Sequence, residues 1–125
     1  MGIIVDWDTH QKQIIRQNYG IHWSWDDYQE AFRRTGQLAQ EVDYPIGLIA
    51  EVADLRHIPH NAVMYGSQAL LGLPSNIVLS VVITRSNIAK MMLNVITKVV
   101  RFKRFTYASS VEEARQYIET KINPG

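Results

Sequence analysis

The chain has 125 residues, enough for one ordinary domain with a sizeable core. Hydrophobic residues make up 46% of it and charged residues 20%, values that are typical of a globular protein and exclude a disordered one. A net charge of +1 excludes a general attraction to nucleic acid or anionic membranes, and the absence of cysteine excludes disulfides, thiol nucleophiles and zinc–thiolate sites. We therefore expect a single domain over residues 1–125.

Signals for export or membrane insertion are missing from the pattern. The first eight residues lack the basic flank and the apolar length of a signal peptide. The longest apolar run, residues 77–83, is too short to span a bilayer. Together with the lack of cysteine, these features predict a cytoplasmic protein with no membrane insertion.

The first half of the chain predicts a hairpin, a helix and a buried strand. Residues 3–7 and 13–19 read as two short strands that form a hairpin at a sheet edge. A helix is expected over residues 25–42, with Ser24 as its N-cap and two aspartates in its first turn, where the helix dipole favours acid. Residues 46–55 form a nearly continuous apolar run, typical of a central strand covered on both faces.

Helices and strands alternate in the second half. The expected elements are a helix at 61–71, a strand at 77–83, a helix capped by Ser86, a strand at 105–108 and a helix opened by the Ser110 capping box. The order β-β-α-β-α-β-α-β-α predicts an α/β fold, with a mixed, largely parallel central sheet of about five strands flanked by four helices.

The third predicted helix has apolar residues at helical spacing. They are Ile88, Met91, Met92, Val95, Ile96 and Val99. We expect this face to pack in the core. If it were exposed, it would be a surface for a partner.

The order of elements resembles the STAS superfamily, the fold of the bacterial anti-sigma factor antagonists. It resembles more closely the bacterial STAS-like proteins that are grouped with the SEC14-like, lipid-binding fold. The local match is an apolar strand that ends in Asp54 and Leu55, followed by a loop and a helix. The resemblance implies a non-enzymatic module that binds or regulates another protein.

The phosphorylation motif of the antagonists is missing here. In those proteins, a partner kinase modifies a serine near the start of the helix that follows the loop. The corresponding position in this chain falls on Val63, Met64 or Tyr65, according to the alignment chosen. Ser67 is the nearest serine, and it could be a phosphorylation switch. The alternative is that Ser67 is a small helix residue packed near the sheet.

The carboxyl ends of the strands are where open α/β sheets bind ligands. Asp54, Arg56 and His57 follow one predicted strand, and Arg85 and Ser86 follow the next. Either arginine could hold an anion beside the helix that starts at Ser86. The alternative is that Asp54 and Ser86 are helix or loop caps and that both arginines are solvated.

Glu51 is the one charged residue well inside the apolar strand. One interpretation is a buried acid in a pocket, which an enzyme would pair with His57. Alternatively, it faces solvent or forms an ion pair with Arg16. His57 and His60 could bind a metal, but the sequence places no third ligand, so we expect no metal and no cofactor.

Aromatic residues concentrate in the first quarter of the chain: Trp7, Tyr19, Trp23, Trp25 and Tyr28. They could line an apolar pocket or a protein-binding face, or they could pack in the core. The basic segment 98–104 ends a predicted helix, where cations suit the dipole, and we expect no nucleic-acid partner.

Three functions are open at this point. The first is a non-enzymatic interaction module that presents His57, His60, Asn61, Tyr65 and Ser67 to a protein partner or to a second copy in a homodimer. The second is a carrier or sensor of a small apolar, lipid or anionic ligand. The third is an enzyme that uses Glu51 with His57. No nucleophile–base pair or phosphate-binding loop is evident, so we expect no catalytic residue.

Overall fold

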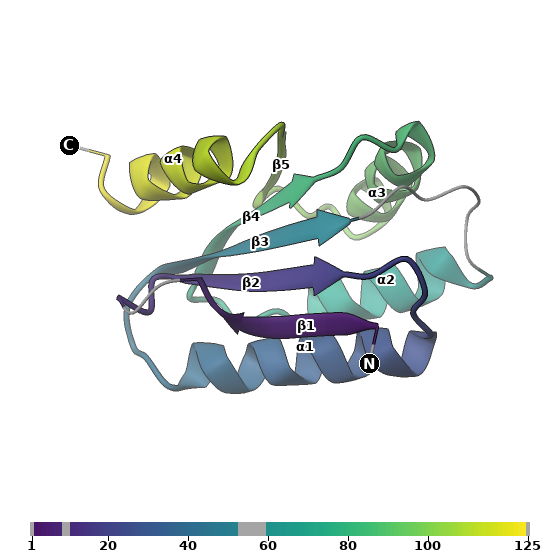
Figure 1. Cartoon of the computed structure of the whole chain (residues 1–125), viewed down its shortest axis with the longest axis horizontal. Helices are drawn as coiled ribbons and strands as arrows, with labels where there is room; N and C mark the ends of the chain where they lie inside the picture. Colours follow the sequence, from purple (N-terminus) through teal and green to yellow (C-terminus); the bar gives the residue numbers. More distant parts are fainter. Residues whose placement is uncertain (1, 9–10, 53–59, 125) are drawn as a thin grey trace.

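The computed structural model describes residues 2–8, 11–52 and 60–124. Within them, the chain forms an α/β fold in the predicted order, with five strands and four helices (Figure 1). The elements are β1 (Ile3–Trp7), β2 (Ile14–Tyr19), α1 (Trp25–Gln40), β3 (Ile46–Val52), α2 (Ala62–Leu71), β4 (Ile77–Ile83), α3 (Asn87–Val99), β5 (Phe105–Ala108) and α4 (Val111–Ile122). The predicted fold class is confirmed.

The sheet has the strand order β1-β2-β3-β4-β5. β1 pairs antiparallel with β2, which confirms the predicted hairpin at a sheet edge, and the other neighbours pair in parallel. β3 lies at the centre, as its apolar run predicts. Successive parallel strands joined by right-handed crossovers in one direction place their connecting helices on the same face.

The two faces of the sheet have different covers, because neighbouring strand residues point to opposite sides. On one face, Ile15 and Leu48 belong to a core that also contains Leu38 of α1. On the other face, Ile49 packs with Ile118 of α4. Helices α1, α2 and α3 therefore share one face, and α4 covers part of the opposite face.

Serine side chains begin three of the four described helices, as predicted. Ser24 forms a capping box with Asp27, Ser86 accepts a hydrogen bond from the Ala89 backbone N–H, and Ser110 accepts one from Glu113. Helix α2 differs: its N-cap residue, Asn61, has a left-handed φ of 61° and makes no side-chain capping bond.

The buried residues of α1 are Ala31, Thr35, Leu38 and Ala39. One expectation about a helix face needs correction. On α3, Ile96 is buried as expected, but Met91, Val95 and Val99 are exposed. The prediction that this whole face packs in the core is wrong, because α2 covers only part of it.

Candidate functional site

The residues singled out after β3 fall in two groups. Asp54, Arg56 and His57 lie outside the described residues. His60 and Asn61 are exposed, and the His60 carbonyl accepts a hydrogen bond of 2.6 Å from the indole N–H of Trp25. Tyr65 stacks on Trp25, with ring centroids 4.8 Å apart. The first turn of α2 is thus held against the start of α1.

Ser67 is poorly placed for phosphorylation. Its side-chain oxygen is buried and has no hydrogen-bond partner among the described residues. A kinase needs an accessible hydroxyl, so the structure supports the interpretation of Ser67 as a small residue packed within the fold.

Arg85 lies in an open cleft of about 790 Å³ at the carboxyl ends of the strands. Lys90 adds a second cation to this cleft, but Glu51 and Glu113 add two carboxylates. Ser86 is buried at the start of α3, where it serves as the N-cap. This supports the capping interpretation of Ser86, and the mixed charges of the cleft favour no anion in particular.

Glu51 is paired with Arg16, as one of the two interpretations predicts. Arg16 also contacts Asp8, at 3.3 Å, and Arg115 of α4 donates two hydrogen bonds to Asp8, at 2.8 and 3.0 Å. The Asp8 side chain is only 1% exposed. The hydrogen bonds from Arg115 hold the pKa of Asp8 below its ordinary value, although burial opposes this.

This ion-pair chain crosses the molecule from α4, through Asp8 just after β1 and Arg16 of β2, to Glu51 of β3. Glu51 is paired with Arg16 and its side chain is 30% exposed, so the premise of the enzyme hypothesis, an unpaired buried acid at Glu51, is not met.

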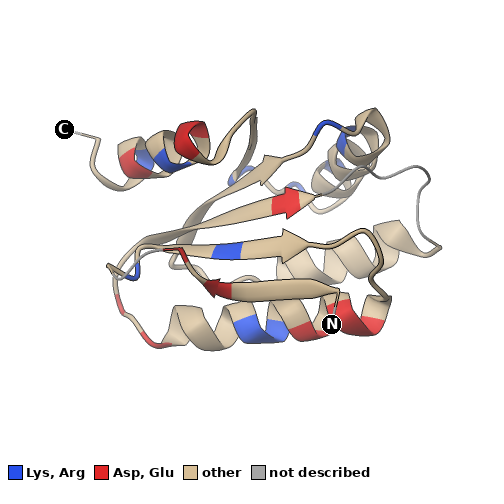
Figure 2. Cartoon of the chain, viewed as in Figure 1, with Lys and Arg blue, Asp and Glu red and all other residues tan. Residues whose placement is uncertain are grey.

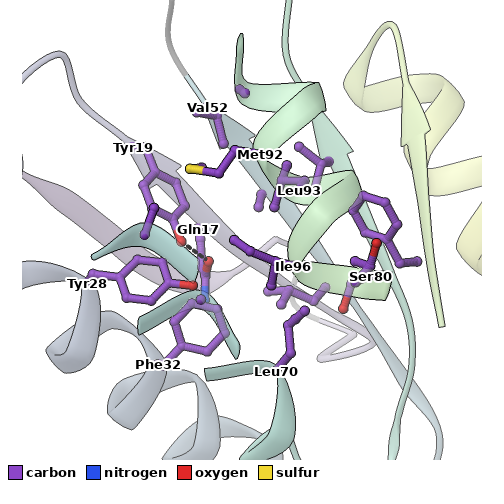
Figure 3. Close-up of a pocket in the computed structure, with 18 of the residues that line it drawn as sticks. Gln17, Tyr19, Tyr28, Phe32, Val52, Leu70, Ser80, Met92, Leu93 and Ile96 are labelled. Atoms are coloured by element: carbon purple, nitrogen blue, oxygen red, sulfur yellow. Dashed lines mark hydrogen bonds between the residues drawn. The ribbon is translucent and has the colours of Figure 1, made fainter. Parts of the chain in front are cut away.

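An apolar cavity of about 80 Å³ lies between the sheet and helices α1, α2 and α3 (Figure 3). Tyr28 and Phe32 of α1 line one side, and Met92, Leu93 and Ile96 of α3 line another. Aromatic residues that the sequence assigned either to a pocket or to the core thus line a cavity; they are Tyr19, Trp23, Trp25 and Tyr28.

Polar groups at the cavity are of two kinds. The Tyr19 hydroxyl donates to Gln17 at 2.8 Å, and the Gln17 amide donates to Thr35 at 2.9 Å (Figure 3). Burial raises the pKa of Tyr19, which keeps its hydroxyl protonated as the donor of this chain. Ser80 is different: its hydroxyl is buried with no hydrogen-bond partner among the described residues.

The outer side of the same helices carries apolar side chains in contact with solvent. They are Val63, Met64 and Leu71 of α2 and Met91, Val95 and Val99 of α3, which we call the α2–α3 face. The two helices touch closely, because a Cβ atom on Gly66 would lie 2.5 Å from Cδ1 of Ile96.

The six residues point outward from the packed sides of their helices. Gly66 and Ile96 mark the place where α2 and α3 touch. At about 100° per residue, Met64 and Leu71 lie on the far side of α2 from Gly66, and Met91 lies on the far side of α3 from Ile96. The α2–α3 face is therefore an exposed apolar surface that extends over both helices.

The stretch of sequence that contains α2 and α3 carries charge of one sign. Residues 55–111 contain no aspartate or glutamate but seven lysines and arginines. Helix α2 has no charged residue at all, while α1 and α4 carry both signs (Figure 2). This acid-free stretch is a signal that the sequence contains and that periodicity alone misses.

No known protein family matches this chain, and neither a curated protein nor a solved structure is similar to it. Among the described residues, no helix is long and apolar enough to cross a membrane. Residues 2–8, 11–52 and 60–124 also contain no group of three or more potential metal ligands.

Proposed function

We propose that this chain is a non-enzymatic interaction module of the STAS type, and that its α2–α3 face binds an acidic, amphipathic helix of a partner protein. The observation that carries the proposal is the set of six exposed apolar side chains on the α2–α3 face. The order of elements supports the STAS resemblance, and this exposed face supports the interaction role.

The free energy of association favours a partner that covers most of the α2–α3 face at once. Burying an apolar side chain fully is worth about 1.5–3 kcal/mol, whereas association costs roughly 4–15 kcal/mol before any gain appears. One or two contacts are therefore insufficient. A helix laid across the α2–α3 face reaches several of the six residues through its i, i+3, i+4 and i+7 positions. Acidic residues on its flanks would meet two helices that contain no aspartate or glutamate.

A protein helix fits this face better than a membrane surface does. Each lysine or arginine near an anionic bilayer contributes about 1 kcal/mol, and stable recognition usually needs a cluster of roughly four to eight. In α3 itself the cations are Lys90 and Lys98. The Lys90 ammonium lies over the Tyr107 ring, on the β5 side of the helix and away from the α2–α3 face. Neither α2 nor α3 contains the tryptophan or phenylalanine that usually anchors an interfacial helix.

The test uses a synthetic acidic helix with leucines at helical spacing and glutamates elsewhere, and fluorescence anisotropy as the readout. Val95→Asp places a carboxylate on the α2–α3 face. Tyr117→Asp is the matched control on α4, since Val95 is 45% exposed and Tyr117 is 41% exposed. We expect Val95→Asp to weaken binding by about tenfold or more, which corresponds to the loss of roughly 1.4 kcal/mol. Tyr117→Asp should leave the affinity unchanged.

The same assay separates the alternatives. A lysine-based helix of the same leucine pattern should bind more weakly than the acidic one, and added salt should reduce the difference between them. Equal effects of the two substitutions, or no binding to the wild type, would refute the proposal. Binding to anionic vesicles in place of the peptide would identify a lipid surface as the partner.

A second function, the sensing of a small apolar ligand, is favoured by one observation. The Ser80 hydroxyl lines the apolar cavity without a hydrogen-bond partner among the described residues, so a ligand with one polar atom could satisfy it. The cavity of about 80 Å³ admits only a few atoms, whereas pockets for drug-sized ligands measure about 300–1,000 Å³.

Native mass spectrometry of gently purified protein tests this second function. A discrete extra mass that disappears in Leu93→Trp, which fills the cavity, would support a ligand. A clean mass in the wild type would leave the interaction module as the proposed function.

A further inference from the structure

Ser80 is the one polar residue of β4, and it lies in the wall of the apolar cavity. β4 runs inside the sheet, between β3 and β5. The residues opposite Ser80 on these strands are Leu48 and Phe105, and opposite residues point to the same face. Ser80 is 6% exposed, and its hydroxyl has no hydrogen-bond partner among the described residues. A polar group is thus held between apolar side chains.

The other polar side chains of the cavity wall differ from Ser80. The Tyr19 hydroxyl donates to Gln17, and the Thr97 hydroxyl donates to a backbone carbonyl of its own helix at 3.2 Å. Gln17, Tyr19 and Tyr28 gather at one end of the cavity (Figure 3). Ser80 lies apart from them, because β3 separates β4 from β2. Within the described chain, the β4 end of the cavity therefore offers Ser80 as its open polar group.

Water is a poorer occupant of this end than a small amphipathic molecule. An internal water usually makes about three hydrogen bonds. Here it would meet at most the hydroxyls of Ser80 and Thr97 among the described side chains, because the rest of this end is apolar. A molecule with one hydroxyl and a short apolar part can make the same hydrogen bonds, and it also removes apolar surface from water.

The size and the charge of the cavity limit what it can hold. A cavity of about 150 Å³ is enough for benzene, so a cavity of about 80 Å³ fits a molecule of roughly half that size. No described residue in the cavity wall is a lysine, arginine, histidine, aspartate or glutamate. Burial of an unpaired charge is costly, so the ligand must be neutral.

We propose that the cavity binds a neutral alcohol of about three or four non-hydrogen atoms, with the Ser80 hydroxyl as its hydrogen-bond partner. An alcohol suits serine because each hydroxyl can donate one hydrogen bond and accept another. This inference rests on the second function proposed above, the sensing of a small ligand, and names the chemical class of that ligand.

A ligand of this size binds weakly, and this sets the concentration at which the site responds. Even the best small ligands gain a limited free energy per atom, so a dissociation constant below about 0.05 mM is out of reach. The cavity would therefore report an alcohol that accumulates to roughly millimolar levels.

The test is a nuclear magnetic resonance titration of methyl-labelled protein with 2-propanol. We expect saturable shifts of the methyl groups of Val82, Leu93 and Ile96, which line the cavity. Ile118 packs on the other face of the sheet, and its methyl groups should not shift. Isopropylammonium has a similar shape but a charge, and it should cause no shift. Shifts that grow without saturation, or that include Ile118 equally, would overturn the proposal.

Two serine variants test the hydrogen bond. Ser80→Ala should weaken 2-propanol binding by about threefold to tenfold, the value of roughly one hydrogen bond. It should also raise the Tm of the alcohol-free protein by a few degrees, because it removes a buried hydroxyl that has no partner. Ser67→Ala is the matched control: its hydroxyl is also buried and without a partner among the described residues, but it is not part of the cavity wall.

Ser67→Ala should leave the affinity for 2-propanol unchanged. Equal affinities of wild type and Ser80→Ala, or a lower Tm for Ser80→Ala, would overturn the proposal. If 2-propanol causes no saturable shift but native mass spectrometry finds another adduct, the alcohol is wrong and the sensing function stands. No shift and no adduct would overturn both.

Discussion

Helices α3 and α4 begin alike but end up in different surroundings. Each starts with a serine N-cap and carries apolar residues at helical spacing. In α4, Ala114 and Ile118 are fully buried against β3 and β4. In α3, Met91, Val95 and Val99 of the equivalent stripe remain exposed. Helical spacing therefore identifies the apolar face, but the neighbouring elements decide whether that face is covered.

The packing of α4 on the sheet is reinforced by an ion pair, whereas no ion pair among the described residues involves α3. Arg115 ties α4 to Asp8 at the far end of β1. Helix α3 packs against α2 through apolar contacts, among them the close contact between Ile96 and Gly66. The following predictions test this contrast, from the largest expected effect to the smallest.

Ile118→Ala should give the largest loss of stability. It deletes buried methyl groups, and such substitutions cost about 2–5 kcal/mol. Val95→Ala on the exposed stripe should cost less than about 0.5 kcal/mol. Urea unfolding followed by circular dichroism measures both. Comparable losses would mean that the α3 stripe is covered in solution and would contradict the contrast.

Asp8→Asn should destabilise the protein by about 2 kcal/mol near neutral pH, because it weakens charged hydrogen bonds to a buried group. The pKa of Asp8 is lowered in the fold, so its contribution is fully present above the ordinary value of 3.8. It should be lost as the pH falls through the lower folded value. The stability difference between wild type and variant should stay constant from about pH 7 to pH 5 and shrink below pH 3.8. A constant difference at all pH values would show that Asp8 acts only through packing.

Gly47→Ala should destabilise by about 1–3 kcal/mol, because a Cβ at this position would lie 2.4 Å from Cγ2 of Ile118. Ile118→Val keeps Cγ2 but removes Cδ1, which would lie 2.7 Å from the same Cβ. The double variant should therefore lose less than the sum of the two single losses. Thermal unfolding of the four proteins measures this coupling, and strict additivity would show that α4 shifts away from β3 instead.

Met91→Ser should have the smallest effect on stability, within about 0.5 kcal/mol, because its side chain is already exposed. It should nevertheless reduce binding of a hydrophobic dye, since it shortens the exposed stripe. Unchanged dye binding would place the exposed apolar surface elsewhere.

Much of the fold follows from local sequence. The three serine caps, the apolar strands and the edge hairpin are all confirmed, since each depends on neighbouring residues. Glu51 and Arg16 were recognisable as a pair because both lie within strands. The contact of Asp8 with Arg115 joins residues 107 positions apart, and no local pattern predicts it.

The candidate site was less predictable for the same reason. Exposure of Val95 depends on how far α2 reaches across α3, and the unpartnered Ser80 hydroxyl depends on how three helices meet the sheet. The absence of acidic residues from 55–111 was readable in the sequence, but only the structure shows that α2 and α3, which lie within that stretch, carry the exposed apolar face.

The most direct test of the central claim is photo-cross-linking in living cells. A photoreactive phenylalanine analogue would replace Val95 on the α2–α3 face. As the control, it would replace Tyr117 on α4, which is exposed to a similar extent. We expect a discrete cross-linked protein from position 95 and none from position 117, with an acidic amphipathic helix at the cross-linked site. Identical patterns at both positions, or no adduct at position 95, would contradict the claim that the α2–α3 face is a docking surface.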